Sequence, residues 1–204
     1  MVYAVLIIAY LIGSLSFAVI VSRWYKLDDP RTYGSNNAGA TNVMRSGHKK
    51  AAILTLLGDA LKGLIVVVIA RVIFHNEVDA STMVGLAGIL VVTGHIFPIF
   101  FKFKGGKGVA TAIGVFLGFS FWLFLLLVLT WLLVYKLSKI SSLSAIIATV
   151  LSPLYAYFLL GNNAYFGATI IIAFFVLYKH KSNLTRLIKK QEKPINLDGD
   201  DESN

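Results

Sequence analysis

Long runs of apolar residues divide the chain, and each is close to the length that a helix needs to cross a lipid bilayer. A crossing helix takes about 20 predominantly apolar residues. Basic and small polar residues are concentrated between these runs. The pattern predicts an all-α integral membrane protein with spans at residues 2–22, 51–74, 82–101, 109–137, 141–160 and 163–178.

The run 109–137 is too long for one comfortable crossing. Gly114 and Gly118 interrupt it, and an aromatic stretch from Phe119 to Trp122 follows them. We therefore predict a hairpin of two short helices in this run. The total becomes seven transmembrane helical segments.

Composition agrees with this fold class and removes several kinds of chemistry. Only 14% of the 204 residues are charged, whereas soluble domains carry about 25%. The absence of cysteine excludes disulfides, a thiol nucleophile and cysteine-ligated zinc. The four histidines show no HxxxH or HExxH spacing, so we expect no protein-held transition metal.

The net charge of +9 first suggests a nucleic-acid partner, but the positions of the basic residues indicate a membrane. With seven segments, the four basic groups fall on one side, which the positive-inside bias makes cytoplasmic. The N-terminus is then outside and the C-terminus cytoplasmic, and no nucleic acid is expected. These groups lie at residues 23–50, 102–107, 136–139 and 179–193.

The chain shows no internal repeat, and we read residues 1–193 as one polytopic membrane domain. The first run lacks a basic n-region and an obvious cleavage site, so it is expected to be retained. Residues 194–204 are polar and acidic, which predicts a disordered cytoplasmic tail.

The segment 34–45, GSNNAGATNVMR, concentrates small and polar residues before the second apolar run. Gly34 and Gly39 permit positive φ and close approach of backbone N–H groups to an oxyanion. Arg45 adds a planar fork for phosphate. The alternative is a turn and a helix cap, which need fewer such residues. The short side-chain donors are Ser35, Asn37, Thr41 and Asn42.

The segment 94–111, GHIFPIFFKFKGGKGVAT, places three lysines between two apolar runs. The turn 105–108 enters the next helix and predicts an anion cradle of free N–H groups beside Lys107. A nucleotide P-loop is excluded because Phe101 and Gly108 occupy its required Gly and Ser/Thr positions. The alternative is lysines that only anchor the helix ends at lipid headgroups.

The segment 180–190, HKSNLTRLIKK, is amphipathic and basic, which is typical of a helix on the membrane surface. Asn183 and Arg186 are three residues apart, so both can point into a site formed with the other two segments. Inside the second run, Asp59 and Lys62 are also one turn apart. Because each charge costs on the order of 3 kcal/mol at mid-bilayer, we expect them to pair structurally, with each other or with a neighbouring helix.

The three basic segments contain no carboxylate. This excludes a carboxylate-held Mg²⁺, the paired acids of glycosidases and a Ser-His-Asp triad there. The remaining neutral donors and cations suit two phosphates, or one phosphate and an oxyanion. Such a site fits transfer between a lipid-like donor and a phosphorylated, water-soluble acceptor.

Over nearly its whole length the sequence resembles the bacterial membrane acyl-phosphate:glycerol-3-phosphate acyltransferases, the PlsY family. A departure is Asn36, where a small residue such as glycine is common. The motifs that carry the resemblance are GSNNAGATNVMR (34–45), GHIFPIFFKFKGGKGVAT (94–111) and NLTR (183–186).

The resemblance implies a seven-segment, multi-pass enzyme of the bacterial cytoplasmic (inner) membrane. Such enzymes transfer a fatty acyl group from acyl phosphate to the 1-hydroxyl of sn-glycerol 3-phosphate. The products are lysophosphatidate and phosphate, in the first acylation of phospholipid synthesis. No metal or other cofactor is expected. The expected partners are the two substrates and the bilayer, with the chain acting as a monomer.

Residue chemistry and resemblance together suggest three groups of site residues. The acyl-phosphate group is Gly105, Gly106, Lys107 and Gly108. The glycerol-3-phosphate group is Ser35, Arg45, Lys104, Asn183 and Arg186. The catalytic group is Asn37, Thr41, Asn42 and His95.

Two questions stay open at the level of sequence. The base that deprotonates the acceptor hydroxyl is either His95 or a phosphate oxygen of the donor, whose second pKa is near 6. The resemblance favours the phosphate. The alternative function is a small membrane transporter of phosphate or an organic phosphate. That alternative is weakened because the site residues lie on one side and no repeat is visible.

Overall fold

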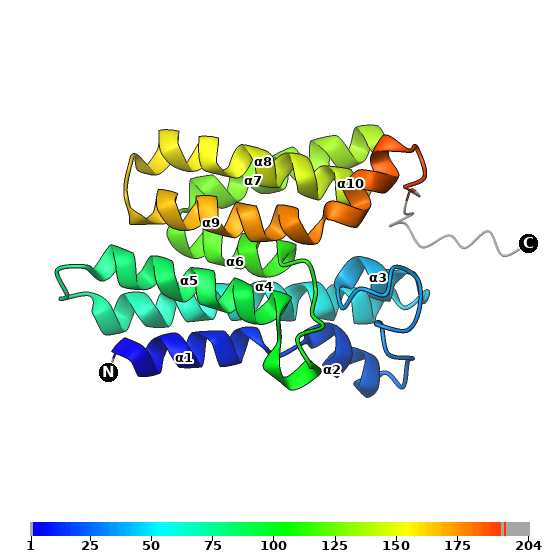
Figure 1. The fold of residues 1–204 in the computed structure, drawn as a ribbon, viewed down its shortest axis with the longest axis horizontal. Coiled ribbons are helices and arrows are strands. Elements are labelled where there is room, and N and C mark those ends of the chain that lie inside the picture. Colours follow the sequence, from blue (N-terminus) through cyan, green and yellow to red (C-terminus); the bar gives the residue numbers. More distant parts are fainter. Residues whose placement is uncertain (1, 193, 195–204) are drawn as a thin grey trace, which may run out of the picture.

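The computed structural model describes residues 2–192 and 194, and within them all regular structure is helical. The helices lie mostly side by side along the long axis of the molecule (Figure 1). In chain order they are α1 (Val2–Gly13), α2 (Phe17–Trp24), α3 (Ala40–Met44), α4 (Lys49–Phe74), α5 (Ala80–Ile96), a 3₁₀ turn (Ile99–Phe101), α6 (Val109–Phe119), α7 (Phe121–Ser138), α8 (Ser141–Leu160), α9 (Ala164–Lys179) and α10 (Lys181–Ile188).

The first predicted span, 2–22, is broken rather than continuous. Helix α1 ends at Gly13, and α2 begins at Phe17 with a bend of 46° between them. The carbonyl oxygen of Leu15, freed by the break, accepts a hydrogen bond from Lys62 Nζ at 2.6 Å. The buried lysine of α4 therefore satisfies a backbone group that the interrupted helix leaves without a helical partner.

The predicted interruption in the run 109–137 lies at Ser120. Helix α6 ends at Phe119, and Ser120 is the N-cap of α7, where its hydroxyl accepts from Leu123 N at 3.4 Å. The chain reverses direction at this point (Figure 1).

Length alone supports fewer crossings than the seven predicted. Among the described residues, four helices are long and apolar enough to span a bilayer, or five if α1 and α2 form one bent span. Helices α6 and α9 are apolar but shorter. The seven-segment count therefore stays a prediction.

Glycines allow the central helices to approach closely. A Cβ atom at Gly114 of α6 would overlap the carbonyl oxygen of Ala60 in α4, and one at Gly63 of α4 would overlap that of Thr111. Gly13 and Gly94 make the same kind of contact between α1 and α5. This close packing holds α4 and α6 in a fixed arrangement, and both helices line the site described below.

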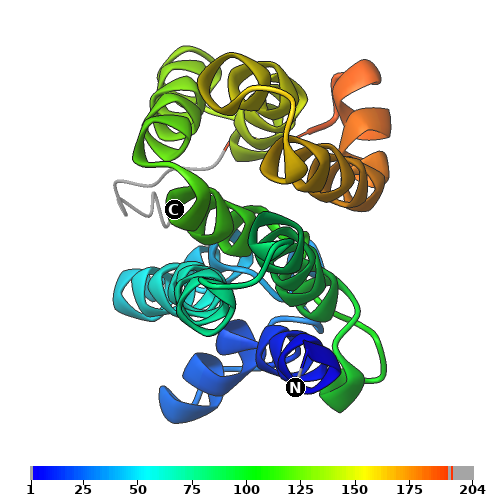
Figure 2. The ribbon, with the colours of Figure 1, turned by 90° about the vertical axis from the view of Figure 1, so that its left-hand side faces the viewer.

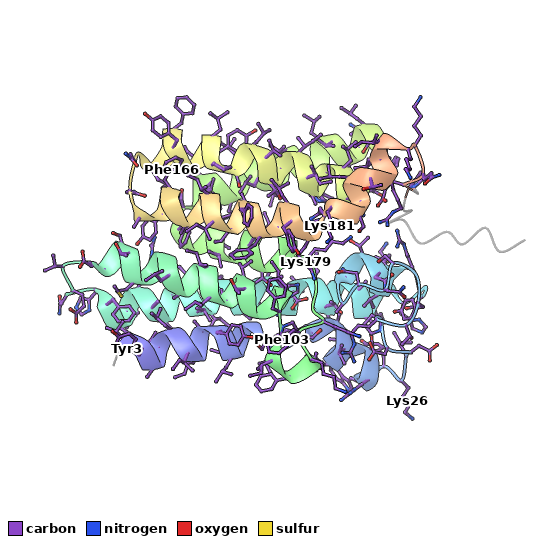
Figure 3. The ribbon with its side chains drawn as sticks, in the orientation of Figure 1. Tyr3, Lys26, Phe103, Phe166, Lys179 and Lys181 are labelled. Atoms are coloured by element: carbon purple, nitrogen blue, oxygen red, sulfur yellow. The ribbon has the colours of Figure 1, made fainter. Side chains whose placement is uncertain are left out.

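The two ends of the helix array differ in chemistry. In the end-on view of Figure 2, helices α7 and α8 lie on one side of α6, and helices α1 and α5 lie on the other. Lys26, Lys179 and Lys181 lie toward the end opposite Tyr3 and Phe166 (Figure 3). The loops that join α2 to α4 and α5 to α6 therefore share an end with the basic groups. The predicted disordered tail falls, except for Pro194, outside the described residues.

Candidate active site

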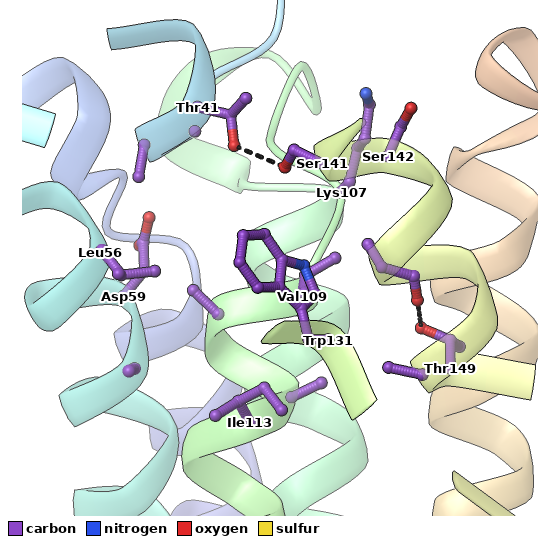
Figure 4. Close-up of a pocket in the computed structure, with 18 of the residues that line it drawn as sticks. Thr41, Leu56, Asp59, Lys107, Val109, Ile113, Trp131, Ser141, Ser142 and Thr149 are labelled. Atoms are coloured by element: carbon purple, nitrogen blue, oxygen red, sulfur yellow. Dashed lines mark hydrogen bonds between the residues drawn. The ribbon is translucent and has the colours of Figure 1, made fainter. Parts of the chain in front are cut away.

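A cavity of about 510 Å³ lies between α3, α4, α6, α7 and α8, at the basic end of the molecule. Its chemistry changes with depth (Figure 4). Thr41, Lys107, Ser141 and Ser142 lie at one end of the view, whereas Ile113 and Trp131 lie deeper between the helices. The cavity therefore combines a polar mouth with an apolar interior.

The mouth is built from four separate parts of the chain. Ser35, Asn37 and Arg45 come from the loop and short helix before α4, and Lys107 comes from the turn before α6. Thr41 Oγ1 lies 3.3 Å from Ser141 Oγ, which joins α3 to the start of α8 across the opening (Figure 4). The C-terminal part contributes His180, Asn183 and Glu192.

The apolar interior is enclosed by α4, α6, α7 and α8. Its deep wall contains Phe116 of α6, which is buried, and Trp131 of α7. On one side the lining is also exposed: Leu56 of α4 is 49% exposed and Leu132 of α7 is 50% exposed. Half-exposed side chains that line the cavity therefore occur on both α4 and α7.

Asn42 holds the loop that forms the mouth. Its Oδ1 accepts from Ser35 N at 2.8 Å, and its Nδ2 donates to Pro30 O at 2.6 Å and Tyr33 O at 3.1 Å. Gly34 has φ +59°, and a Cβ atom there would overlap Asn42 Oδ1. The buried amide thus replaces the regular backbone pairing that this loop lacks.

The turn before α6 brings backbone amides and a lysine to the mouth. Gly108, with φ +89°, is the N-cap of α6, so the first amides of that helix have no helical acceptor. Burial lowers the pKa of Lys107 to about 8; Glu192 counteracts this effect, and Arg186, Arg45 and Lys179 add to it. An anion at this point would meet free N–H groups, the helix dipole and a cation.

A buried charged cluster lies beneath the mouth. Lys62 Nζ is 2.7 Å from Asp59 Oδ1 and 3.0 Å from His95 Nδ1. His95 Nδ1 is also 3.3 Å from the same carboxylate oxygen. The predicted structural pairing of Asp59 with Lys62 is confirmed, and both Asp59 and His95 line the cavity.

Glu192 adds a carboxylate where none was expected. It accepts from Ser142 Oγ at 2.7 Å, from Asn183 Nδ2 at 2.6 Å and from Arg186 Nε at 2.6 Å. Burial alone would raise the pKa of Glu192, but these hydrogen bonds outweigh it and lower the pKa below its usual value. The ionised side chain ties α10 to the start of α8.

Comparison with known proteins identifies the family. Residues 3–190 match the family model described as glycerol-3-phosphate acyltransferase. The glycerol-3-phosphate acyltransferase of Chromobacterium violaceum is 52% identical over 199 residues, which cover 97% of each chain. That of a Neisseria meningitidis serogroup C strain is 52% identical over 188 residues, covering 92% of this chain and 94% of the relative. The chain belongs to the glycerol-3-phosphate acyltransferase family.

Two solved structures of this family share the fold. A crystal structure of PlsY, an integral membrane glycerol 3-phosphate acyltransferase, in its glycerol 3-phosphate form has a TM-score of 0.89 and 35% identity. The lysophosphatidic acid form of PlsY has a TM-score of 0.87 and 34% identity, and each match covers 96% of both chains. The present acyltransferase is thus an all-helical, multi-pass integral membrane protein.

Most of the site residues predicted from sequence line this one cavity of the acyltransferase. The exceptions are Lys104 and Gly105, which line a separate hollow, Gly106, which packs against His95, and Arg186, which reaches the cavity only through Glu192. Those that line the cavity are Ser35, Asn37, Thr41, Asn42, Arg45, His95, Lys107, Gly108 and Asn183.

The sequence reasoning missed several polar residues of the acyltransferase cavity. Two acid side chains, Asp59 and Glu192, line the cavity, and both lie outside the three basic segments. Asp59 was seen only as a buried charge, and Glu192 is brought in by a turn after α10 that has no sequence signature. Ser141 and Ser142 precede an apolar run and look like ordinary helix caps, while His180 stands among basic surface residues.

Proposed function

We propose that this acyltransferase moves a fatty acyl group from acyl phosphate to the 1-hydroxyl of sn-glycerol 3-phosphate, which yields lysophosphatidate and phosphate. The observation that carries this proposal is the joining of a cationic, amide-rich mouth to an apolar interior within one cavity. The mouth suits two phosphorylated reactants, and the interior suits an acyl chain. The reaction would be the first acylation of phospholipid synthesis.

The two reactants would divide the mouth between them. The turn that ends at Gly108, with Lys107 and the first amides of α6, would cradle the acyl phosphate. Ser35, Arg45 and Asn183 would bind glycerol 3-phosphate, with Arg186 acting through Glu192. Because acyl phosphate is already an activated anhydride, alignment of the two reactants would supply several kcal/mol of the catalysis.

Asn37 and Thr41 would donate hydrogen bonds to the oxyanion that develops on the acyl carbon. Both line the cavity close to the α6 N-terminus and are not buried. Asn42 would act differently, because its amide is already used by Ser35, Pro30 and Tyr33. It positions the loop and does not touch the reacting atoms.

The donor phosphate, rather than His95, would take the proton of the acceptor hydroxyl. His95 Nδ1 faces Lys62 and Asp59, and its Nε2 lies against the backbone of Gly106. The contacts of Nδ1 with Lys62 and Asp59 remove one of the two ring nitrogens of His95 from proton transfer, which supports the donor phosphate as the base. A phosphate oxygen with a second pKa near 6 can accept the proton near neutral pH.

The same proposal includes the cellular setting. We place the enzyme in the bacterial cytoplasmic membrane with seven segments, the N-terminus outside and the mouth of the cavity facing the cytoplasm. The gathering of the basic loops at one end supports this orientation (Figure 3). The enzyme would act as a monomer and without a metal.

A direct assay tests the function. Purified protein in detergent, given acyl phosphate, glycerol 3-phosphate and a chelator, should release phosphate and form lysophosphatidate at equal rates. A transporter of phosphate or organic phosphate would release none. Loss of turnover with the chelator, or turnover with acyl-CoA at the same rate, would contradict the proposal.

The role of His95 is tested by His95→Asn, which can keep a hydrogen bond within the buried cluster. We expect appreciable turnover and an unchanged pH profile of kcat/KM between about pH 6 and pH 8, because the base belongs to the substrate. A general base would contribute about 10² to 10⁴ in rate. A loss of that size in a variant with unchanged thermal stability would identify His95 as the base.

A further inference from the structure

A second hollow, of about 530 Å³, lies outside the cavity and is lined by different residues. It is lined by residues of the loop after α2, the turn before α6 and the end of α9. The polar and aromatic side chains around it are Arg31, Thr32, Asn36, Phe103, Lys104 and Lys179.

The hollow carries an excess of positive charge. Arg31 is paired with Asp29, with Nη2 to Oδ2 at 2.6 Å and Nε to Oδ1 at 2.9 Å, and it lies over the Phe101 ring. Lys179 Nζ lies 5.4 Å from the centre of the Phe97 ring, in a cation–π contact. Within the part of the chain that the structure describes, neither Lys104 nor Lys179 forms a salt bridge, and no acidic residue lines the hollow. Two cations therefore face it without an anionic partner.

Exposed apolar side chains lie in the loop that contributes Phe103 to the hollow. Ile99, Phe100 and Phe103 are 49%, 56% and 57% exposed, and they belong to the loop that leaves α5 at the basic end. Aromatic side chains beside lysines at a helix end are typical of the membrane–water interface. A ligand in the hollow would thus have its charge near Lys104 and any acyl chain beside Phe103.

We propose that this hollow is a second anion site, distinct from the acyl-transfer cavity, that binds the phosphate group of an anionic lipid headgroup or of a free phosphate ester. Lys104 and Lys179 would supply charge, while Thr32 and Asn36 would supply neutral donors. The apolar border favours the lipid. The inference does not depend on acyl phosphate being the donor.

Occupancy of the hollow would also brace the mouth of the cavity. The chain between Lys104 and Lys107 passes from the hollow to the cavity, and the loop from Arg31 to Ser35 contributes to both. Asn42 clamps this loop at Pro30 and Tyr33. A phosphate held by Thr32 and Lys104 would therefore join two loops whose other parts form the mouth.

The experiment compares two double variants of equal charge. Lys104→Ala with Lys179→Ala removes both free cations of the hollow. Lys102→Ala with Lys181→Ala removes two exposed lysines that lie two residues away and line neither the hollow nor the cavity. Native mass spectrometry measures phosphatidylglycerol retained by each protein after exchange against phosphatidylcholine. Calorimetry with inorganic phosphate forms the second arm.

Lipid retention should fall about fivefold for each hollow lysine removed and little in the control pair. Retention of phosphatidylglycerol identifies a lipid headgroup as the source, and phosphate binding without lipid retention identifies a free phosphate ester. Thermal unfolding midpoints verify folding, with Lys104→Gln alone as a milder variant. Equal effects of both pairs would overturn the proposal. So would a loss confined to the KM for glycerol 3-phosphate, with neither lipid nor phosphate binding changed.

Discussion

Lys107 is a proposed phosphate-binding residue whose pKa, about 8, lies near neutral pH. Its pKa is lowered to about 8, chiefly by burial, so the side chain is mainly charged at neutral pH and mainly neutral above pH 9. Phosphate monoesters have lost their second proton well below this range. The charge on Lys107 is thus the one expected to change between pH 7 and 9 among the groups proposed to touch the phosphates.

We therefore expect kcat/KM to fall roughly tenfold between about pH 7 and pH 9, because only the charged lysine attracts the anionic substrate. Lys107→Arg should flatten this decline, since an arginine stays charged throughout. Initial rates across the range, at low concentration of each substrate in turn, measure the effect. A wild-type profile that stays flat to pH 9.5 would contradict the assignment.

Asn42 and Asn37 differ in role although they belong to one motif. Asn42→Ala removes three hydrogen bonds of a buried amide and should destabilise the protein by about 2 to 3 kcal/mol. Asn37→Ala should leave the thermal midpoint nearly unchanged and lower kcat about 100-fold or more. Unfolding curves and kcat values, measured on the same preparations, distinguish the two roles. Full stability of Asn42→Ala with a lost kcat would reverse the two roles.

The motif chemistry was largely predictable at this scale, but the individual roles were not. Clustered glycines and asparagines before α4 indicate an anion-binding loop whatever their detailed geometry. Both asparagines line the cavity, but spacing cannot tell that the amide of Asn42 is bonded to the Pro30 carbonyl. It cannot show Glu192 either, because that contact depends on how the chain folds back after α10.

At the scale of elements, the close approach of α4 and α6 is the contact on which the cavity floor depends. Gly114→Ala would press a Cβ atom into the Ala60 carbonyl and should cost about 1 to 3 kcal/mol. Gly167→Ala in α9 is the matched control, because its Cβ would meet nothing within 4 Å. It should be neutral or stabilise the helix by up to about 1 kcal/mol.

Thermal inactivation midpoints in one detergent compare the two glycine variants. Equal midpoints would show that α4 and α6 can move apart without loss of stability, and would contradict the importance of their close packing. A lower midpoint for Gly167→Ala than for Gly114→Ala would do the same.

The helices themselves were foreseen better than their breaks. Apolar runs predicted every long helix, and the glycine and aromatic signals predicted the interruption that lies at Ser120. The break after Gly13 was missed because its cause is distant in sequence: Lys62 of α4 supplies the donor that makes a freed carbonyl tolerable. A hydropathy pattern reveals apolar runs, but it cannot reveal a hydrogen-bond partner that lies far away in the sequence.

At the scale of the whole molecule, the basic loops and the mouth of the cavity share one end. This arrangement was predictable, because the positive-inside bias places basic loops on the cytoplasmic side of the membrane. The number of crossings was not settled by the same reasoning, since α6 and α9 are shorter than the usual span. An experiment on sidedness is therefore informative.

The chain has no cysteine, so single substitutions can report sidedness without background. Glu77→Cys lies in the exposed turn between α4 and α5, and Lys136→Cys lies near the end of α7. A membrane-impermeant maleimide should label the first in intact spheroplasts and the second only after permeabilisation. Labelling of both before permeabilisation, or the reverse order, would contradict the orientation with an outside N-terminus.

The half-exposed leucines of α4 and α7 have a consequence for how the acyl chain enters the cavity and how the product leaves it. Because Leu56 and Leu132 line the cavity and are half exposed, we expect an acyl chain to enter from the leaflet between α4 and α7, while the charged co-substrate arrives from water. The newly made molecule would leave by the same doorway without ever being hydrated along its tail. Such an enzyme would hand its product directly to the bilayer.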